Sequence, residues 1–196
     1  YLSKRFGSEY ITDYKILNAC DYGAPQERRR FIMIGIRRDY KPNVKIEFPE
    51  PQKDNKHTVR DAIADLENIE PSKSVEDAPI TRQEFSDNDF TKSLQADQKL
   101  IFNHVNTDTR STALERFKNI EQGKNFHSLD PELKMNTYSD PSRTQNTIYL
   151  RLNYEQACGT VVNVRKSMWI HPTKDRAISI REAARLQTFP DSYIFE

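Results

Sequence analysis

The chain of 196 residues has only two cysteines, five glycines and one tryptophan. The two cysteines, Cys20 and Cys158, form no Cys-x-x-Cys pair, and the four histidines are scattered, so no zinc-binding spacing is visible. No apolar run approaches the roughly 20 residues that a membrane span needs, and the N-terminus has no signal-peptide pattern. We therefore expect a cytoplasmic protein with no metal site and no membrane contact.

The composition, 36% hydrophobic and 30% charged, is typical of a globular protein that buries one good core or two small ones. The net charge of +1 is uneven: residues 1–41 carry +4, residues 42–100 carry −5 and residues 101–196 carry +2. Residues 134–185 hold nine basic and four acidic side chains, which makes them the best candidate for a surface that binds phosphates. Solvated faces alone can also produce such an imbalance.

The most informative stretch is residues 18–38. Its apolar run at residues 31–36 is rich in β-branched residues and predicts a strand buried on both faces, as in a parallel or mixed sheet. Just before it, Gln26, Arg28 and Arg30 alternate, so in extended geometry their side chains share one face. Two guanidinium groups and an amide suit phosphate oxygens or a base edge. The residues alone equally allow solvated charges at the end of a strand.

This stretch resembles the Gln-x-Arg-x-Arg motif of DNA cytosine-5 methyltransferases. Residues 19–25 read Ala-Cys-Asp-Tyr-Gly-Ala-Pro, which is similar to the Ala-x-Asp-Tyr-Gly-x-Pro segment that precedes the motif in that family. A second family motif resembles residues 176–191, which include Arg-Glu-Ala-Ala-Arg-Leu-Gln. Because the two motifs occur in the family's order around a variable region, the chain is identified as the C-terminal part of a bacterial member.

The resemblance implies an α/β fragment in three parts. Residues 1–41 are expected to be a remnant of the catalytic domain, at the edge of its Rossmann-like sheet, with neighbouring strands at residues 14–18 and 31–36. Residues 42–175 are expected to form a mixed α+β target recognition domain, and residues 176–196 a helix that links it back to the catalytic domain. The proline-containing loop at residues 41–51 marks the first boundary.

Local patterns predict further elements. Three capping-box patterns predict helices that begin at Thr58, Thr112 and Ser179, the last ending before Pro190. Strands are predicted at residues 148–152, 161–164 and 168–170. Residues 70–100 are acidic and lack apolar periodicity, which favours a long connection or a partly ordered insertion.

The resemblance also implies a function, the transfer of a methyl group from S-adenosylmethionine to carbon 5 of a flipped cytosine in double-stranded DNA, within a restriction-modification system. Arg28 and Arg30 would stabilise the flipped cytosine and its adduct. The residues expected to contact DNA are Gln26, Arg28, Thr160, Arg165 and Lys166. A structural motif would comprise Arg181, Glu182, Arg185 and Gln187, with both arginines as ion-pair partners first. For Thr160, β-propensity alone also explains a threonine at the start of a strand.

The sequence departs from the family where the chemistry is concentrated. It has no Pro-Cys-Gln nucleophile, no Glu-Asn-Val segment and no glycine-rich cofactor motif. Cys20 and Cys158 are better explained as small buried residues than as nucleophiles. We therefore expect a monomeric fragment that is inactive and binds no cofactor alone, and that needs a missing N-terminal catalytic half, in cis or as a separate subunit.

Two alternatives stay open: a non-catalytic DNA-binding module, and the second subunit of a split methyltransferase. Relatives that methylate tRNA are disfavoured by the long variable region between the two motifs.

Overall fold

The computed structural model describes residues 2–40, 45–52, 54, 56–106 and 108–196. In chain order its helices and strands, with η for a 3-10 helix, are α1 (Leu2–Phe6), β1 (Tyr10–Asn18), η1 (Ala19–Tyr22), β2 (Arg29–Arg37), α2 (Val59–Ile63), η2 (Ala64–Leu66), β3 (Ile80–Thr81), α3 (Asp89–Gln95), β4 (Leu100–Ile101), α4 (Ser111–Lys118), η3 (Phe126–Ser128), α5 (Pro131–Lys134), η4 (Pro141–Arg143), α6 (Val164–Ser167) and α7 (Ile180–Arg185). None of the described helices has the length and apolar character needed to cross a membrane. Part of the predicted boundary loop, residues 41–44, lies outside the described residues.

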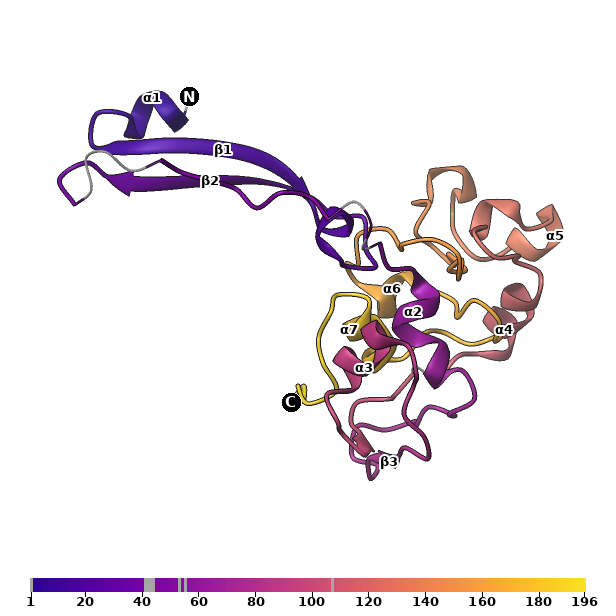
Figure 1. The fold of residues 1–196 in the computed structure, drawn as a ribbon. Helices are drawn as coiled ribbons and strands as arrows, with labels where there is room; N and C mark the ends of the chain where they lie inside the picture. Colours follow the sequence, from indigo (N-terminus) through magenta and orange to yellow (C-terminus); the bar gives the residue numbers. More distant parts are fainter. Residues whose placement is uncertain (1, 41–44, 53, 55, 107) are drawn as a thin grey trace.

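Strands β1 and β2 form an antiparallel hairpin that reaches out from the rest of the molecule as an arm (Figure 1). The pairing runs from Tyr10 opposite Arg37 to Asn18 opposite Arg29. At the end of the arm nearest the body, η1 closes with Gly23, whose φ of 85° lies in the left-handed region that glycine tolerates best. Both predicted strands exist, and each is longer than its sequence pattern indicated.

The burial predicted for residues 31–36 is wrong within the described structure. Phe31, Ile32 and Ile34 are exposed, and their strand pairs in antiparallel fashion. β-branched and apolar residues favour extended backbone, but burial also needs elements that cover the faces of the sheet. The described residues leave large apolar side chains open on both strands, including Tyr14 and Ile16.

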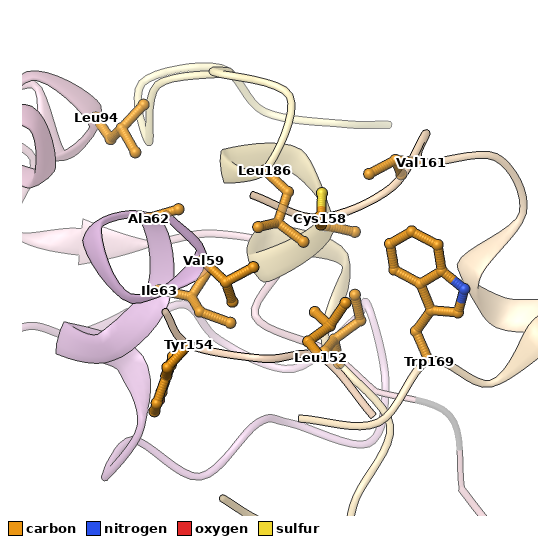
Figure 2. Close-up of a cluster of buried hydrophobic side chains, with 12 residues drawn as sticks. Val59, Ala62, Ile63, Leu94, Leu152, Tyr154, Cys158, Val161, Trp169 and Leu186 are labelled. Carbon is orange, nitrogen blue, oxygen red and sulfur yellow. The ribbon is translucent and has the colours of Figure 1, made fainter. Parts of the chain in front are cut away.

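The body of the molecule packs around two hydrophobic clusters. The first joins α2 with residues near the C-terminus, and Figure 2 shows Val59 and Ile63 facing Leu152, Trp169 and Leu186. The second lies beneath α4 and is built by Ala113, Phe117, Ile120, Phe126, Leu129, Tyr149 and Ile170. The first cluster therefore contains residues from both sides of the predicted boundary at residue 175, and the division into domains stays a prediction.

Two of the three predicted capping boxes are confirmed. At α2, the Thr58 backbone N–H donates to the Asp61 carboxylate (2.8 Å) and the Asp61 N–H to the Thr58 hydroxyl (3.4 Å). At α7, the Ser179 hydroxyl accepts from the Glu182 N–H (3.0 Å), and the Glu182 carboxylate accepts from the Ser179 N–H (2.7 Å). As predicted, α7 ends before Pro190.

The third capping box is wrong. The N-cap of helix α4 is Arg110, two residues before the predicted Thr112, and no side chain caps the helix. Glu115, which was expected to complete the box, pairs with Lys118 instead (3.3 Å). The apolar face was predicted correctly, because Phe117 and Ile120 are buried in the second cluster.

The three strands predicted between residues 148 and 170 do not form. The structure has only isolated bridges there, which pair Ile170 with residues 151 and 177 and Cys158 with Gln26. Tyr149 and Met168 have φ values of 51° and 50°, so the backbone reverses where an extended strand was expected. The Asn163 side chain accepts from the Lys166 N–H and starts helix α6 within the strand predicted at residues 161–164. The burial does not alternate either, because Tyr149 and Arg151 are as buried as Leu152, whereas Ile148 and Leu150 are only partly buried.

Residues 70–100 contain regular structure, contrary to prediction. β3 pairs with β4 in antiparallel fashion, and α3 lies between them in the sequence. The Asn88 side chain caps α3, and the Thr91 hydroxyl donates to the Asp61 carbonyl (2.6 Å). Polar contacts with α2, which a search for apolar periodicity does not detect, therefore anchor this acidic stretch.

A buried cluster of charges connects α7 to η2 and to the residue that follows β3. Arg185 is fully buried and contacts Asp65 (2.5 Å) and Asp191 (2.6 Å). Arg82 contacts the same two carboxylates from the other side, at 2.7 and 2.5 Å. Burial opposes ionisation of Asp65, but Arg185 outweighs it and lowers the pKa of that carboxyl below its ordinary value. Arg181 lies 3.7 Å from Asp191 as a third buried cation, so arginines and aspartates compensate one another's charge in the interior.

Replacing one member of this cluster should be costly. We expect Arg185→Met to lower the free energy of unfolding by about 3–5 kcal/mol, because two buried carboxylates lose a cation. Glu115→Gln, which breaks an exposed pair, should cost less than about 1 kcal/mol. Urea unfolding of the full-length protein measures both, and equal losses would contradict the role given to the buried cluster.

The buried His171 makes stability depend on pH. Burial lowers the pKa of its imidazole to about 4, despite the opposing carboxylate of Glu182 (3.7 Å). Between pH 6.5 and about 4 the unfolded chain therefore binds a proton that the folded chain excludes, and stability falls as the pH falls.

We expect His171→Gln to reduce this slope by up to about 1.4 kcal/mol per pH unit in that range. Urea midpoints at several pH values measure it. A variant that keeps the full wild-type slope would show that His171 is not the group responsible.

Candidate functional site

The segment from Pro25 to Arg28 lies where the arm joins the body (Figure 1). It runs beside residues 158–161, with Gln26 and Cys158 in a parallel bridge. The Cys158 N–H donates to the Pro25 carbonyl (2.9 Å), and the Glu27 N–H donates to the Cys158 carbonyl (2.7 Å). Two segments far apart in the sequence are thus joined through their backbones.

Gln26 is turned into the body, away from solvent. Its side chain is 2% exposed, and both ends of its amide are used. The amide nitrogen donates to the Leu186 carbonyl (3.2 Å), and the amide oxygen accepts from the Val161 N–H (3.2 Å). The prediction that Gln26, Arg28 and Arg30 share one exposed face is wrong for Gln26, because β2 begins only at Arg29 and the alternation of a ladder does not extend back to it.

Arg28 and Arg30 face outward. Arg28 is half-buried, and its backbone is fixed to the Asn18 side chain (2.8 Å) and to Ala19 (3.0 Å). Within the described residues its guanidinium has no hydrogen-bond or ion-pair partner. The exposed Arg30 donates only to the neighbouring Arg29 carbonyl (2.7 Å). These two guanidinium groups are therefore available to an anionic or carbonyl-bearing ligand.

Thr160 lies against the same segment. Its hydroxyl donates to the Glu27 carbonyl (3.0 Å), between Gln26 and Arg28 in the sequence. The next residue, Val161, is buried in the first cluster. The structure thus brings Thr160 together with Gln26 and Arg28, as the sequence-based hypothesis requires.

A pocket of about 600 Å³ opens beside Thr160. Lys166 lines it from α6, whereas Arg165 on the same helix is exposed but outside the lining. Arg143 and Gln145 also line the pocket, and neither was singled out from the sequence. Only the excess of basic residues between 134 and 185 pointed to Arg143.

The predicted structural motif lies in the interior. Arg181 is fully buried and donates to the carbonyls of Phe102 (2.9 Å), Pro190 (3.0 Å) and Tyr193 (2.7 Å). A paired hydrogen bond joins Glu182 to Arg176, at 2.7 and 2.8 Å.

Arg181, Glu182 and Arg185 thus all contact groups of the protein. Gln187 lies just after α7 and is half-buried. The link between this motif and the site is the Leu186 carbonyl, which accepts from Gln26.

The described residues hold no group of three or more His, Cys, Asp or Glu side chains that could bind a metal ion. His104 is buried and contacts the Ser179 hydroxyl and the Ile69 carbonyl, both at 2.9 Å. It is thus satisfied by the protein itself.

Comparisons with known proteins agree on one family. A model of the C-5 cytosine-specific DNA methylases matches residues 3–196. Type II methyltransferase M.DdeI of Desulfomicrobium norvegicum is 32% identical over 92% of this chain and 45% of its own, and M.XorII of Xanthomonas oryzae is 30% identical over 96% and 45%. A crystal structure described as a DNA modification methyltransferase encoded within an E. coli prophage superposes with a TM-score of 0.71, at 25% identity, over 97% of this chain and 54% of that one.

The chain thus spans about half the length of these relatives. One prediction needs correction, the restriction of the resemblance to a C-terminal target recognition part. The family model describes the methylase itself, and it matches residues 3–196 without distinguishing a recognition part. The assignment of this chain to a C-terminal target recognition part is therefore withdrawn. The fold is α/β with small antiparallel sheets, in agreement with the methyltransferase neighbour. This chain belongs to the C-5 cytosine-specific DNA methylase family.

Proposed function

We propose that the protein carrying this chain methylates carbon 5 of cytosine in double-stranded DNA, and that the junction of arm and body holds the target nucleotide. The observation that carries the proposal is the docking of Thr160 and Val161 on the segment that presents Arg28. A hydroxyl-bearing loop and two outward guanidinium groups meet there, at the two motifs that characterise the family. The names of the matched relatives, type II methyltransferases, support a role in restriction-modification.

The arginines suit the charge that this reaction develops. A cytosine inside a duplex is not accessible at carbon 5, so it must leave the base stack. Addition of a nucleophile at carbon 6 places negative charge on the ring and on the carbonyl oxygen at carbon 2. A fixed guanidinium near that oxygen stabilises the charge as it forms. We assign this role to Arg30, and contact with the nucleotide's phosphates to Arg28, with Thr160, Arg165 and Lys166 as further DNA contacts.

The family's methyl donor, S-adenosylmethionine, supplies an electrophilic methyl group when bound. The described residues do not offer it a glycine-lined site, because the glycines stand apart. Gly35 lies within β2 beside Tyr10 and Thr12, Gly123 lies in a turn near Asn153, and Gly159 has open space around it. We therefore assign the donor to no residue of this chain.

The two thiols are poor candidates for the attacking nucleophile. Cys158 is buried, and burial raises the pKa of its thiol to about 12. The pKa of Cys20 is also raised, by burial and by the nearby carboxylate of Asp21. Since a thiolate is the reactive form, both environments oppose nucleophilic attack. We propose that the nucleophile of the reaction is neither of these cysteines.

Substitution of Arg30 tests the proposal. In the full-length protein, Arg30→Ala should lower the rate of methyl transfer from labelled S-adenosylmethionine to duplex DNA by about 10²-fold, through loss of charge stabilisation. The matched control is Arg29→Ala, which removes an exposed guanidinium from the opposite face of the strand. Equal losses in the two variants would contradict the role of Arg30, and a wild-type protein that methylates no cytosine would contradict the proposed function.

Alkylation distinguishes the two thiols. At pH 8 a thiol with a pKa of about 12 is ionised only to about 1 part in 10⁴. We expect iodoacetamide to modify the half-buried Cys20 in the folded protein and Cys158 only after unfolding. Mass spectrometry of peptides from both conditions measures this. Rapid modification of Cys158 in the folded protein would contradict the burial of its thiol and reopen its role as a nucleophile.

A further inference from the structure

We infer that Gln26 is a positioning residue, which fixes the loop carrying Thr160 relative to Arg28 and Arg30 and does not itself contact DNA. The inference rests on the proposed function and deepens it. It explains how groups from two distant segments act on one nucleotide.

The first observation is the chemistry of the Gln26 contacts. Its amide donates on one side to the Leu186 carbonyl, at the end of α7, and accepts on the other from the Val161 N–H. A primary amide can do both at once, whereas a carboxylate only accepts and an aliphatic side chain does neither. Gln26 is 2% exposed and both polar atoms of its amide already have a protein partner, so burial keeps the side chain out of reach of DNA.

The second observation is the position of the loop. Three contacts besides Gln26 hold it: the two backbone hydrogen bonds of Cys158, and the Thr160 hydroxyl on the Glu27 carbonyl. The Val161 side chain anchors the loop to the body, because it lies in the first hydrophobic cluster with Cys158 and Leu186 (Figure 2). Val162, directly beyond, is 80% exposed.

Gln26 therefore contacts the loop at Val161, the last buried residue before the exposed Val162. Without it, the buried Val161 N–H loses its acceptor, and the contact between the loop and the end of α7 is lost.

The consequence is a fixed geometry. Thr160 is held between the Glu27 carbonyl on one side and the Val161–Gln26 contact on the other. Arg28 follows Glu27 directly, so a shift of this loop changes the distance between the Thr160 backbone and the guanidinium groups. Displacement of a positioned group by about 1 Å can cost about 10² in rate. Gln26 thus acts on the reaction through Thr160, and its effect should depend on the presence of Thr160.

A double-mutant cycle in the full-length protein tests this. The variants are Gln26→Ala, Thr160→Ala and the double substitution, with the exposed Gln156→Ala as the matched control. The measurements are kcat, the KM for duplex DNA, and the fluorescence of 2-aminopurine at the target position, which rises when the base leaves the stack. Thermal unfolding identifies the temperature range in which each variant is folded.

We expect Gln26→Ala to lower kcat by about 10–10²-fold and to reduce the fluorescence gain at saturating DNA, with the KM changed less than kcat. The double variant should be no more than about threefold slower than the slower single variant, because both substitutions release the same loop. Gln156→Ala should behave as wild type.

The inference is overturned if the losses of the two single variants multiply in the double variant, since Gln26 would then act independently of the loop. It is also overturned if Gln26→Ala methylates at the wild-type rate, or if only its KM changes, as for a direct DNA contact. A wild-type protein that methylates no cytosine overturns the proposed function and this inference together. The two failures are therefore distinguishable.

Gln26→Glu gives a second, independent readout if Gln26→Ala does not fold. An ionised carboxylate cannot donate to the Leu186 carbonyl, but a protonated one can, while its other oxygen still accepts from Val161. We expect the rate of this variant, relative to wild type at the same pH, to rise as the pH falls toward about 5. A ratio independent of pH would overturn the role of the amide donor.

Discussion

The contact between buried arginines and aspartates is the constraint on which the rest of the body depends. Arg185 and Arg82 share the carboxylates of Asp65 and Asp191, so one cluster joins η2, the β3 region, α7 and the C-terminal segment. Buried charges are expensive unless they are paired, and such a cluster can form only if all the elements that carry its charges are in place. This requirement fixes the end of α7, and with it the Leu186 carbonyl that receives Gln26. The geometry of the candidate site thus depends on charges that lie outside it.

Local signals in the sequence located the elements that local chemistry determines. Thr58 and Ser179 start helices because each caps its own first turn with a partner three residues away, so both could be read from the sequence. Apolar alternation between residues 148 and 170 gave the wrong element, because positive φ values at Tyr149 and Met168 are set by the fold. Alternation predicts burial on one face only if the backbone is extended, and here the buried Tyr149 and Arg151 belong to the face that was expected to be open.

The candidate site was predicted in part, for a similar reason. The motif residues identified the right place, and Thr160 does lie beside it. The orientation of Gln26 could not be read from its neighbours, because its two partners, Val161 and Leu186, are far away in the sequence. The pocket residues Arg143 and Gln145 carried no motif, and only the fold shows that they line the same pocket as Thr160.

The spacing of the Gln-x-Arg-x-Arg motif acquires a physical meaning from this division. In a regular strand, alternate residues share a face, which would make three equivalent ligand contacts. Here the ladder begins at Arg29, so Gln26 precedes it and Arg28 lies at its edge. An uncharged amide can be buried when both its ends are paired, whereas a guanidinium at the same place would also bring a charge to be compensated. The motif therefore combines Gln26, which joins two segments of the protein, with Arg28 and Arg30, which remain free for the ligand. The uncharged residue lies in the interior and the two charged residues lie toward the surface.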